Sequence, residues 1–439
     1  MTQRENFGSK FAVIMAFAGS AIGLGNIWRF PYIAGEGGGA AFVLVFIAAT
    51  LILSLPIFMA ESVIGRRSGS NCLGAMKKLA PGKLWMAFGA LSIFTPLFIV
   101  SYYSIVGGWS LEFLFESLTL SFTGTEPQAV SGIFANFTAG TWGPILTFTI
   151  FLGLTCLIPA FGVTSGIERF SKISIPILFV IIVGVAVYSL SLPGAGSGAE
   201  YLLKPDFSKL TLKTCANAVG QSFYSLSLGM GIIITYSSYV KKSENIMSSA
   251  VGTSISALLF SVIAGLAIMP AVFSAGINPD SGPGLIFETL PYIFSTMGES
   301  LPWLSAVVAI LFFLTVLVAA LTSSISLVEV GIAYLVEEKK LGRKLSALIC
   351  FGGVWAAGMI CVLLPKVFDV FDLISSNLLM PVCALLGVIF VGWVMGKADA
   401  YDELTSGGSI KGRSHKAVFF AIKYIAPVMI VAILLFNLF

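Results

Sequence analysis

The sequence predicts an all-α membrane protein with many transmembrane helices, and two properties of its composition carry this prediction. Of its 439 residues, 57% are apolar and only 10% are charged, whereas a soluble domain carries about 25% charged residues. Apolar runs of about 20 residues, the length that crosses a bilayer as a helix, recur from end to end. These runs are continuous rather than alternating, which favours helices over the strands of a barrel.

Eleven spans are expected from these runs. Five of them would form a first repeat (10–192), five a second, inverted repeat (214–396), and the last a separate helix (417–439). The remaining segments would be a cytoplasmic N-terminal segment (1–9), an extracellular loop (193–213) and a cytoplasmic loop (397–416). The predicted spans are 10–34, 40–65, 84–118, 142–160, 166–192, 214–240, 246–274, 301–337, 345–364, 371–396 and 417–438. The stretch 275–300, rich in Gly and Pro, is expected to be an external loop with a short helix.

The distribution of Lys and Arg favours a cytoplasmic N-terminus, because such residues are enriched in cytoplasmic loops. Of the 25 Lys and Arg residues, five would fall on the outer side and the other twenty on the inner side. The outer five are Arg29, Lys204, Lys209, Lys213 and Lys366. With eleven spans, the C-terminus would then be extracellular. The chain is therefore predicted to be a multi-pass protein of the cell membrane.

Two of the predicted spans are interrupted by glycine. One interruption lies in AGSAIGLGN (18–26), between Gly19 and Gly25, and the other is SLSLGMG (225–231). They open the two predicted repeats, and paired interruptions at matching positions are typical of a transporter binding site. An unwound stretch frees carbonyl oxygens for a cation, and the half-helix after it presents N–H groups to an anion. For either motif taken alone, close helix packing on glycine is the competing explanation.

The motif GSAIGLGNIWRFP (19–31) resembles the first-helix signature of the neurotransmitter:sodium symporter family. The segments GGGAAF (37–42), GIERFSK (166–172), QSFYSLSLGMG (221–231) and LTSS (321–324) also match, so the resemblance spans nearly the whole chain. It implies the leucine-transporter type of fold, an inverted repeat of two five-helix halves with broken first and sixth helices and one extra helix. The eleven-span arrangement resembles a bacterial subgroup in the inner membrane. The implied activity is sodium-coupled symport of an amino acid by alternating access.

Carried over residue by residue, the resemblance implies a well-matched second sodium site. Its ligands would be the carbonyl oxygens of Gly19, Ile22 and Ala319 and the hydroxyl groups of Thr322 and Ser323. Oxygen ligands without a full charge suit a site that must release its ion. Hydroxyl groups in membrane helices also bond to the preceding helical turn, which is the competing explanation for Thr322 and Ser323.

The resemblance also implies a first sodium site, which matches less well. It would use the carbonyl oxygen of Ala21, the side chains of Asn26 and Ser225, and the carboxylate of the substrate. The position where relatives carry Asn or Asp is Ala257 in this chain, or Ser256 if the register differs by one residue. One or two sodium ions are therefore expected.

Chloride dependence is expected to be absent. Relatives that bind chloride carry a tyrosine in the second span, where this chain has Phe46. Ser261 stands where chloride-dependent relatives carry serine, and Gln221 and Ser225 would line the same pocket. The missing tyrosine hydroxyl would remove a hydrogen-bond donor that an anion needs.

Gly23 is expected to determine the substrate class. Amine transporters of the family carry aspartate there, so glycine implies a substrate that brings its own carboxylate, an α-amino acid. That carboxylate would meet the N–H groups of Leu24 and Gly25 and the hydroxyl of Tyr103, and the amino group would meet carbonyl groups near Ala21, Tyr224 and Ser225. The expected side-chain pocket is mainly apolar and uncharged, which favours a neutral, hydrophobic or aromatic L-amino acid. It consists of Ile99, Tyr103, Tyr224, Ser227, Met230, Ser323 and Leu327.

Charged residues within or beside the spans are costly unless they are paired. Arg29 and Asp372 resemble the two halves of an external gate, and Arg4 and Glu337 those of an internal gate. Glu61, in the second span, is interpreted as structural and bound to the backbone around a break.

Other classes of function are less well supported. The only histidine is His415 and the six cysteines form no CxxC pair, so neither an enzyme nor a zinc site is expected. The net charge of +4 is interpreted as a topology signal rather than as nucleic-acid binding. A channel would need a continuous polar pore, whereas the polar residues gather between two gates. A transport-inactive amino-acid sensor with the same site stays open, and so does the oligomeric state, including a homodimer.

Overall fold

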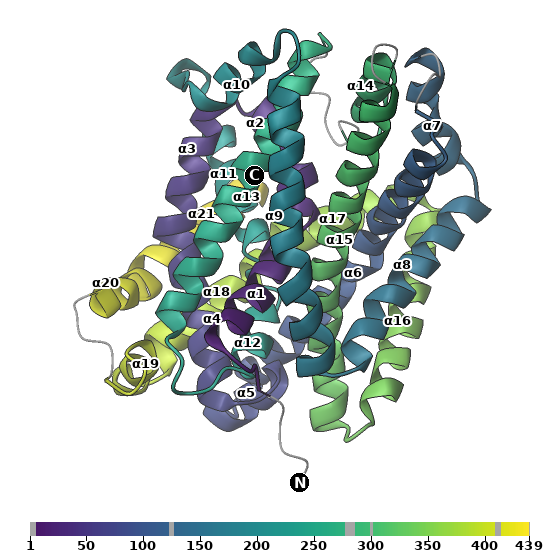
Figure 1. Cartoon of the computed structure of the whole chain (residues 1–439). Coiled ribbons are helices and arrows are strands. Elements are labelled where there is room, and N and C mark those ends of the chain that lie inside the picture. Colours follow the sequence, from purple (N-terminus) through teal and green to yellow (C-terminus); the bar gives the residue numbers. More distant parts are fainter. Residues whose placement is uncertain (1–5, 123–126, 277–285, 299–301, 409–413, 439) are drawn as a thin grey trace.

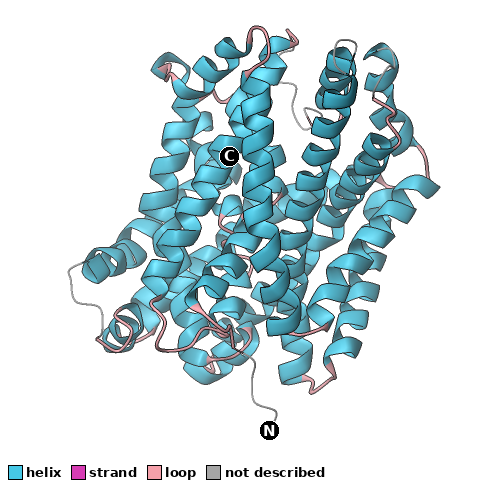
Figure 2. Cartoon of the chain, in the orientation of Figure 1, coloured by secondary structure: helices cyan, strands magenta, loops and turns pink. Residues whose placement is uncertain are grey.

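The computed structural model describes residues 6–122, 127–276, 286–298, 302–408 and 414–438. These residues form helices and loops without a strand (Figure 2), which confirms the all-α prediction. Among them, nine helices are long and apolar enough to cross a membrane, and a helix pair bent by 55° at the first predicted break makes a tenth. The predicted sixth span is also helical, but it is divided into two helices that are each too short to qualify.

The first five predicted spans are continuous helices or helices joined end to end, and only the first is broken. The segments are α1 (Lys10–Ala21) with η1 (Gly25–Arg29) and α2 (Phe30–Glu36); α3 (Ala40–Ala49), η2 (Thr50–Ser54) and α4 (Leu55–Ser68); α6 (Lys83–Leu118); α8 (Trp142–Ala160); and η3 (Val163–Glu168) with α9 (Arg169–Leu190).

The remaining six spans repeat this pattern, with the break again in the opening span. They are α11 (Leu212–Ser225) with α12 (Ile232–Ser237); α13 (Ile246–Ser274); α15 (Pro302–Glu338); α16 (Arg343–Leu363); α17 (Pro365–Ile374), η6 (Ser375–Leu379), α18 (Met380–Ile389) and η7 (Phe390–Val394); and α20 (Ser414–Phe420), η8 (Ala421–Ile425) and α21 (Ala426–Leu438). The largest difference from the predicted boundaries is at the tenth span, which begins at Pro365 instead of 371. Proline is tolerated in a first helical turn because no N–H is needed there.

Short helices lie at both ends of the bundle. Figure 1 shows α7 (Pro127–Ala139), α10 (Ala195–Leu203) and α14 (Thr289–Gly298) at one end, and α5 (Cys72–Leu79) and α19 (Lys397–Leu404) at the other. A single 3₁₀ turn, η4 (Phe207–Lys209), follows α10. The helix α14 lies within the predicted external loop 275–300, whereas α5 and α7 were not predicted.

The two repeats pack through equivalent helices. The third span packs along the eighth (α6 with α15), and the fourth along the ninth (α8 with α16). The helix α1 lies against α9, α13 and α15, and its residues from Ala16 to Ala21 are all buried. The broken first span is therefore surrounded by protein, which is the condition under which irregular backbone is tolerated at membrane depth.

Polar side chains define where several helices start. Ser9 accepts a hydrogen bond from the N–H of Ala12 at the start of α1 (3.2 Å). Thr211 accepts one from Thr214 at the start of α11 (3.0 Å), and Asn245 one from Ser248 at the start of α13 (3.0 Å). Such caps satisfy N–H groups that have no partner within the helix.

A buried ion pair joins α19 to the C-terminal end of α4. Arg66 Nε lies 2.6 Å from Glu403 Oε2, and both side chains are at most 3% exposed. The Arg66 guanidinium also donates to the carbonyl oxygens of Glu403 and Glu244 (both 2.5 Å). These contacts of Arg66, here called the clamp, therefore include the loop between α12 and α13. Next to it, the more exposed Arg67 pairs with Asp399 and with Asp402 (2.9 Å).

Glu403→Ala is predicted to destabilise the protein by about 3 kcal/mol, because it leaves the Arg66 guanidinium buried without its counter-charge. The matched control is Asp402→Ala on the same helix, which removes an exposed pair worth less than about 1 kcal/mol. Thermal unfolding of the detergent-purified protein measures both variants. Equal melting temperatures for the two would contradict the structural role assigned to the buried pair.

Candidate functional site

The first break is narrower than predicted and begins later. The helix α1 continues through Gly19 and ends at Ala21, Ile22 leaves helical geometry (φ −93°, ψ 86°), and η1 begins at Gly25. A Cβ on Gly19 would lie 3.1 Å from Ser171 Oγ on α9, so this glycine serves the close approach of two helices. For Gly19, packing therefore explains the residue type better than unwinding does.

The second break, 226–231, does depend on backbone conformations that favour glycine. Gly229 (φ +72°), Gly231 (φ +65°) and Ser227 (φ +55°) all adopt left-handed geometry. Glu61 Oε1 accepts a hydrogen bond from the N–H of Gly229 (2.7 Å), as expected for a structural carboxylate bound to the break.

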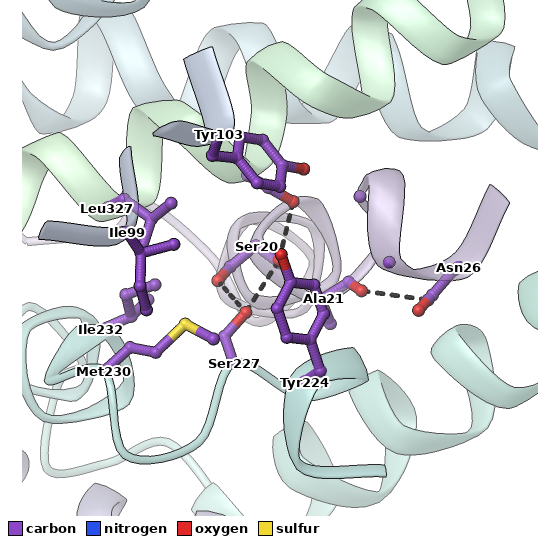
Figure 3. Close-up of a pocket in the computed structure, with 13 residues that line it drawn as sticks. Ser20, Ala21, Asn26, Ile99, Tyr103, Tyr224, Ser227, Met230, Ile232 and Leu327 are labelled. Carbon is purple, nitrogen blue, oxygen red and sulfur yellow. Dashed lines mark hydrogen bonds between the residues drawn. The ribbon is translucent and has the colours of Figure 1, made fainter. Parts of the chain in front are cut away.

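Side chains from other segments satisfy the carbonyl groups that the first break leaves free. Ser227 Oγ donates to the Ser20 carbonyl (2.9 Å), and the hydroxyls of Ser20 and Ser227 also bond to each other (3.0 Å, Figure 3). Asn26 Nδ2 donates to the Ala21 carbonyl (3.0 Å). The two breaks are thus joined directly, although Ser20 and Ser227 are far apart in the sequence.

A buried, uncharged pocket lies at this junction (Figure 3). Ten of the twelve predicted substrate-binding residues line it: Ala21, Gly23, Gly25, Ile99, Tyr103, Tyr224, Ser227, Met230, Ser323 and Leu327. The other two, Leu24 and Ser225, are buried beside it without lining it. The structure adds Ser20, Asn26 and Ile232 to the lining. Ser20 stands inside the predicted motif, whereas only the turn at Gly231 places Ile232 there.

Gly23 lies where the pocket leaves no space for a side chain. A Cβ at this position would overlap Ser323 Oγ and would lie 2.9 Å from Tyr103 Oη. Next to it, the N–H of Leu24 donates to the Tyr103 hydroxyl (3.0 Å). An aspartate side chain at position 23 therefore has no space in this structure.

The residues predicted for the second sodium site lie where α15 contacts the end of α1 and the first break. Thr322 Oγ1 lies 3.3 Å from the Ile22 carbonyl oxygen and 2.9 Å from that of Ala319. Ser323 Oγ lies 3.5 Å from the Gly19 carbonyl oxygen and 3.0 Å from that of Ser20. The five predicted ligands thus fall in two groups of buried neutral oxygen atoms, one around Thr322 and one around the neighbouring Ser323. The described residues hold no cluster of three or more His, Cys, Asp or Glu suited to a metal.

The residues predicted for the first sodium site carry oxygen atoms without partners. Asn26 Oδ1 and Ser225 Oγ are buried, and neither has a hydrogen-bond partner among the described residues. Ala257 is completely buried and offers no side-chain ligand. The alternative, Ser256, donates its hydroxyl back to the Gly252 carbonyl (2.8 Å).

The predicted external gate residues lie above the pocket without a direct ion pair. The Arg29 guanidinium stacks over the Tyr224 ring, 4.9 Å from its centroid, and Tyr224 itself covers Gly25. Asp372 Oδ1 accepts a hydrogen bond from Tyr102 (3.1 Å). Among the described ion pairs, none within 4.0 Å joins Arg29 to Asp372.

Arg4, predicted for the internal gate, lies outside the described residues, so its predicted pairing with Glu337 is not described. Glu337 Oε2 accepts from the main-chain N–H (2.8 Å) and the side-chain amide (2.9 Å) of Asn71. Phe7 N–H donates to the Tyr239 carbonyl (3.1 Å), which brings the N-terminal segment next to the C-terminal end of α12.

Comparison with known proteins places this arrangement in a family. The profile of the sodium:neurotransmitter symporter family matches residues 4–130 and 138–439. The chain belongs to this family. An uncharacterised sodium-dependent transporter of Bacillus subtilis is 35% identical, with 98% of this chain and 96% of the relative aligned. The serotonin transporter of Drosophila melanogaster, which is sodium-dependent, is 27% identical over 99% of this chain and 76% of its own length.

A solved structure supports the same assignment. The crystal structure of MhsT in complex with L-phenylalanine superposes with a TM-score of 0.91 at 36% identity, and the match covers all of both chains. This match confirms the predicted inverted-repeat fold with broken first and sixth helices. Membership of this family confirms the prediction of a sodium-dependent membrane symporter. The family is a transporter family and not an enzyme class.

Gly229→Ala is predicted to destabilise the fold far more than Gly69→Ala. Both glycines have positive φ (72° and 54°), so each alanine incurs the left-handed penalty of about 1 kcal/mol. At Gly229 a Cβ would also overlap the Met380 carbonyl, whereas Gly69 has open space. Thermal unfolding of both variants measures the difference, and similar melting temperatures would show that the second break is not held as described.

Proposed function

We propose that this protein imports a neutral L-amino acid with a hydrophobic or aromatic side chain, together with sodium, by alternating access. The observation that carries the proposal is the uncharged pocket at the break. Ser323 and Tyr103 leave no space for a side chain at Gly23, and neutral oxygen atoms of the predicted second sodium site lie beside the pocket. The bound L-phenylalanine of MhsT supports the aromatic side of this range.

The substrate's two charged groups would be recognised by the backbone of the break. Its carboxylate would replace the Tyr103 hydroxyl as a partner of the Leu24 N–H and would also meet Gly25 and Tyr103. Its amino group would bind carbonyl oxygens near Ala21, Tyr224 and Ser225. Ile99, Met230 and Leu327 would surround the side chain without any charge, which excludes a strongly polar substrate.

Sodium is a co-substrate in this proposal, and two ions are assigned. At the second site, the Ser323 hydroxyl donates to the Ser20 carbonyl of the break (3.0 Å), whereas the Thr322 hydroxyl lies closer to the Ala319 carbonyl of its own helix (2.9 Å) than to the Ile22 carbonyl of the break (3.3 Å). On ion binding those hydroxyls would rotate, so that carbonyl and hydroxyl oxygens face the cation together. Each positive charge that enters down a potential of 100 mV contributes about 2.3 kcal/mol to substrate accumulation.

Chloride is not assigned a role, because the donors that could bind it are already used. Phe46 is buried and has no hydroxyl. Ser261 donates to the Ala257 carbonyl (2.9 Å), and Gln221 Nε2 to the Gly25 carbonyl (2.7 Å). Only the Ser225 hydroxyl is left free.

The topology assigned from Lys and Arg completes the proposal. The N-terminus and the end of the bundle with α5 and α19 would face the cytoplasm, and the C-terminus would be extracellular. In this orientation the clamp formed by Arg66 lies on the cytoplasmic side. No nucleic-acid partner is assigned, and a homodimer stays a question for measurement of the mass in detergent.

The alternative function is an amino-acid sensor that binds in the same pocket without transport. Counterflow in proteoliposomes separates the two, because only a transporter exchanges labelled amino acid for internal unlabelled amino acid. Uptake of label against its gradient is expected. Specific binding with no exchange would refute import and establish the sensor.

A screen of the twenty amino acids is predicted to show that phenylalanine and other large apolar amino acids stabilise the protein against thermal unfolding when Na⁺ is present. Charged amino acids are expected to give no shift, because the pocket has no counter-charge for their side chains. Replacing Na⁺ by K⁺ is the control and should abolish the shift. A response confined to charged amino acids, or one that is equal in K⁺, would contradict the proposed substrate and ion.

Thr322→Val, which removes one oxygen without changing the shape of the side chain, is predicted to raise the Na⁺ concentration for half-maximal uptake about tenfold or more. The control is Thr315→Val on the same helix, since the Thr315 hydroxyl only bonds back to Leu311 (2.7 Å). Sodium-dependent uptake measures both variants. If Thr322→Val behaves like the control, the hydroxyl is only bonded within its helix and does not bind sodium.

A further inference from the structure

The first sodium site lacks one of its expected ligands. Ala257, on α13, carries only a methyl group where relatives have Asn or Asp, and its carbonyl oxygen accepts a hydrogen bond from Ser261. The site predicted from the sequence therefore has three protein ligands, namely the Ala21 carbonyl, Asn26 and Ser225. The substrate carboxylate would be a fourth ligand, and hard cations in proteins take about six, so the site has room for a further oxygen atom.

Gln221 carries a buried oxygen atom close to this site. Its side chain is 1% exposed, and Oε1 has no hydrogen-bond partner among the described residues, like Asn26 Oδ1 and Ser225 Oγ. Gln221 and Ser225 are one turn apart on α11 and therefore share a helix face. That face packs on η1, which begins with Gly25 and Asn26.

The orientation of both amide groups follows from their donors. Gln221 Nε2 donates to the Gly25 carbonyl (2.7 Å), and Asn26 Nδ2 to the Ala21 carbonyl (3.0 Å). Rotating either amide would place its oxygen against a carbonyl oxygen, so the assignment of nitrogen and oxygen is determined by the contacts. Two amide oxygens are thus left as acceptors in the same buried region.

We propose that Gln221 Oε1 is a ligand of the first sodium ion and supplies the oxygen atom that Ala257 cannot. The inference rests on the proposed sodium-coupled function and names a residue that the first-site prediction did not include. Amide, hydroxyl and carbonyl oxygens form a hard, neutral donor set of the kind that binds such a cation. The atom of Gln221 without a partner is the acceptor Oε1, which repels an anion, whereas the donor Nε2 is bonded to the Gly25 carbonyl, so the arrangement favours a sodium site over a chloride site.

The experiment measures how the Na⁺ concentration affects the melting temperature of the detergent-purified protein, in the presence of the amino acid that stabilises it most. Gln221→Leu, which removes the amide but keeps the bulk, is expected to raise the half-maximal Na⁺ concentration about tenfold or more. It should also lower the Hill coefficient to one, because only the second site then responds. The matched control is Asn217→Leu, the same change one turn earlier on α11, which should leave both values unchanged.

Gln221→Glu provides a second variant that keeps an oxygen atom in place and adds negative charge. Its half-maximal Na⁺ concentration is expected to fall below that of the native protein at pH 8. A value equal to or above the native one would overturn the proposal, as would Gln221→Leu behaving like Asn217→Leu. If Gln221→Leu does not fold, the Gln221→Glu result decides.

Repeating the titration with gluconate in place of chloride distinguishes the two ions. Equal sodium responses of the native protein in both salts are expected. If chloride strengthens sodium binding and Gln221→Leu removes that effect, Gln221 binds the anion and the inference is wrong. A native protein that does not respond to sodium at all would refute the proposed function itself, whereas a native response that Gln221→Leu leaves unchanged refutes only this inference.

Discussion

The rest of the structure depends on one constraint: at the level of the bilayer core, each main-chain carbonyl freed by a helix break must find a partner inside the protein. In the first span these carbonyls belong to Gly19, Ser20, Ala21 and Ile22. Their partners are side chains from distant segments, Ser227 in the second break and Thr322 and Ser323 on α15, together with Asn26 just beyond the break. The break is thus stable only in the assembled bundle.

These side-chain hydrogen bonds stabilise the break and can also be exchanged for other contacts. Three of the four side chains that bond to these carbonyls, Ser227, Thr322 and Ser323, carry hydroxyls, which donate in this structure and can accept when they rotate. Under the proposed function, a cation would enter with little movement of the surrounding helices, because the carbonyls would exchange one partner for another. The proposed substrate site shares this property, because the Leu24 N–H is bonded to the side-chain hydroxyl of Tyr103 rather than to the main chain.

The surrounding helices provide the rigid part of the arrangement. Equivalent helices of the two repeats pack along each other, α6 with α15 and α8 with α16, and α15 carries Thr322 and Ser323 to the break. At one end of the bundle, Arg66 joins α4, the loop before α13 and α19 through hydrogen bonds and an ion pair. This end is therefore fixed by charged groups, whereas the break in the middle is held by exchangeable hydrogen bonds.

The sequence by itself determined the class of fold, the spans to within a few residues, the existence of two breaks and most of the pocket lining. These depend on hydrophobic length and on local motifs, which are properties of neighbouring residues. Only the tertiary structure decided that Gly19 serves packing while Gly229 serves a left-handed turn, since both read as glycine in an apolar run. It also decided that Ser20 meets Ser227, that Arg29 and Asp372 do not form a direct pair, and that Gln221 Oε1 is left without a partner. Such facts depend on contacts between segments that are far apart in the sequence, which no local pattern records.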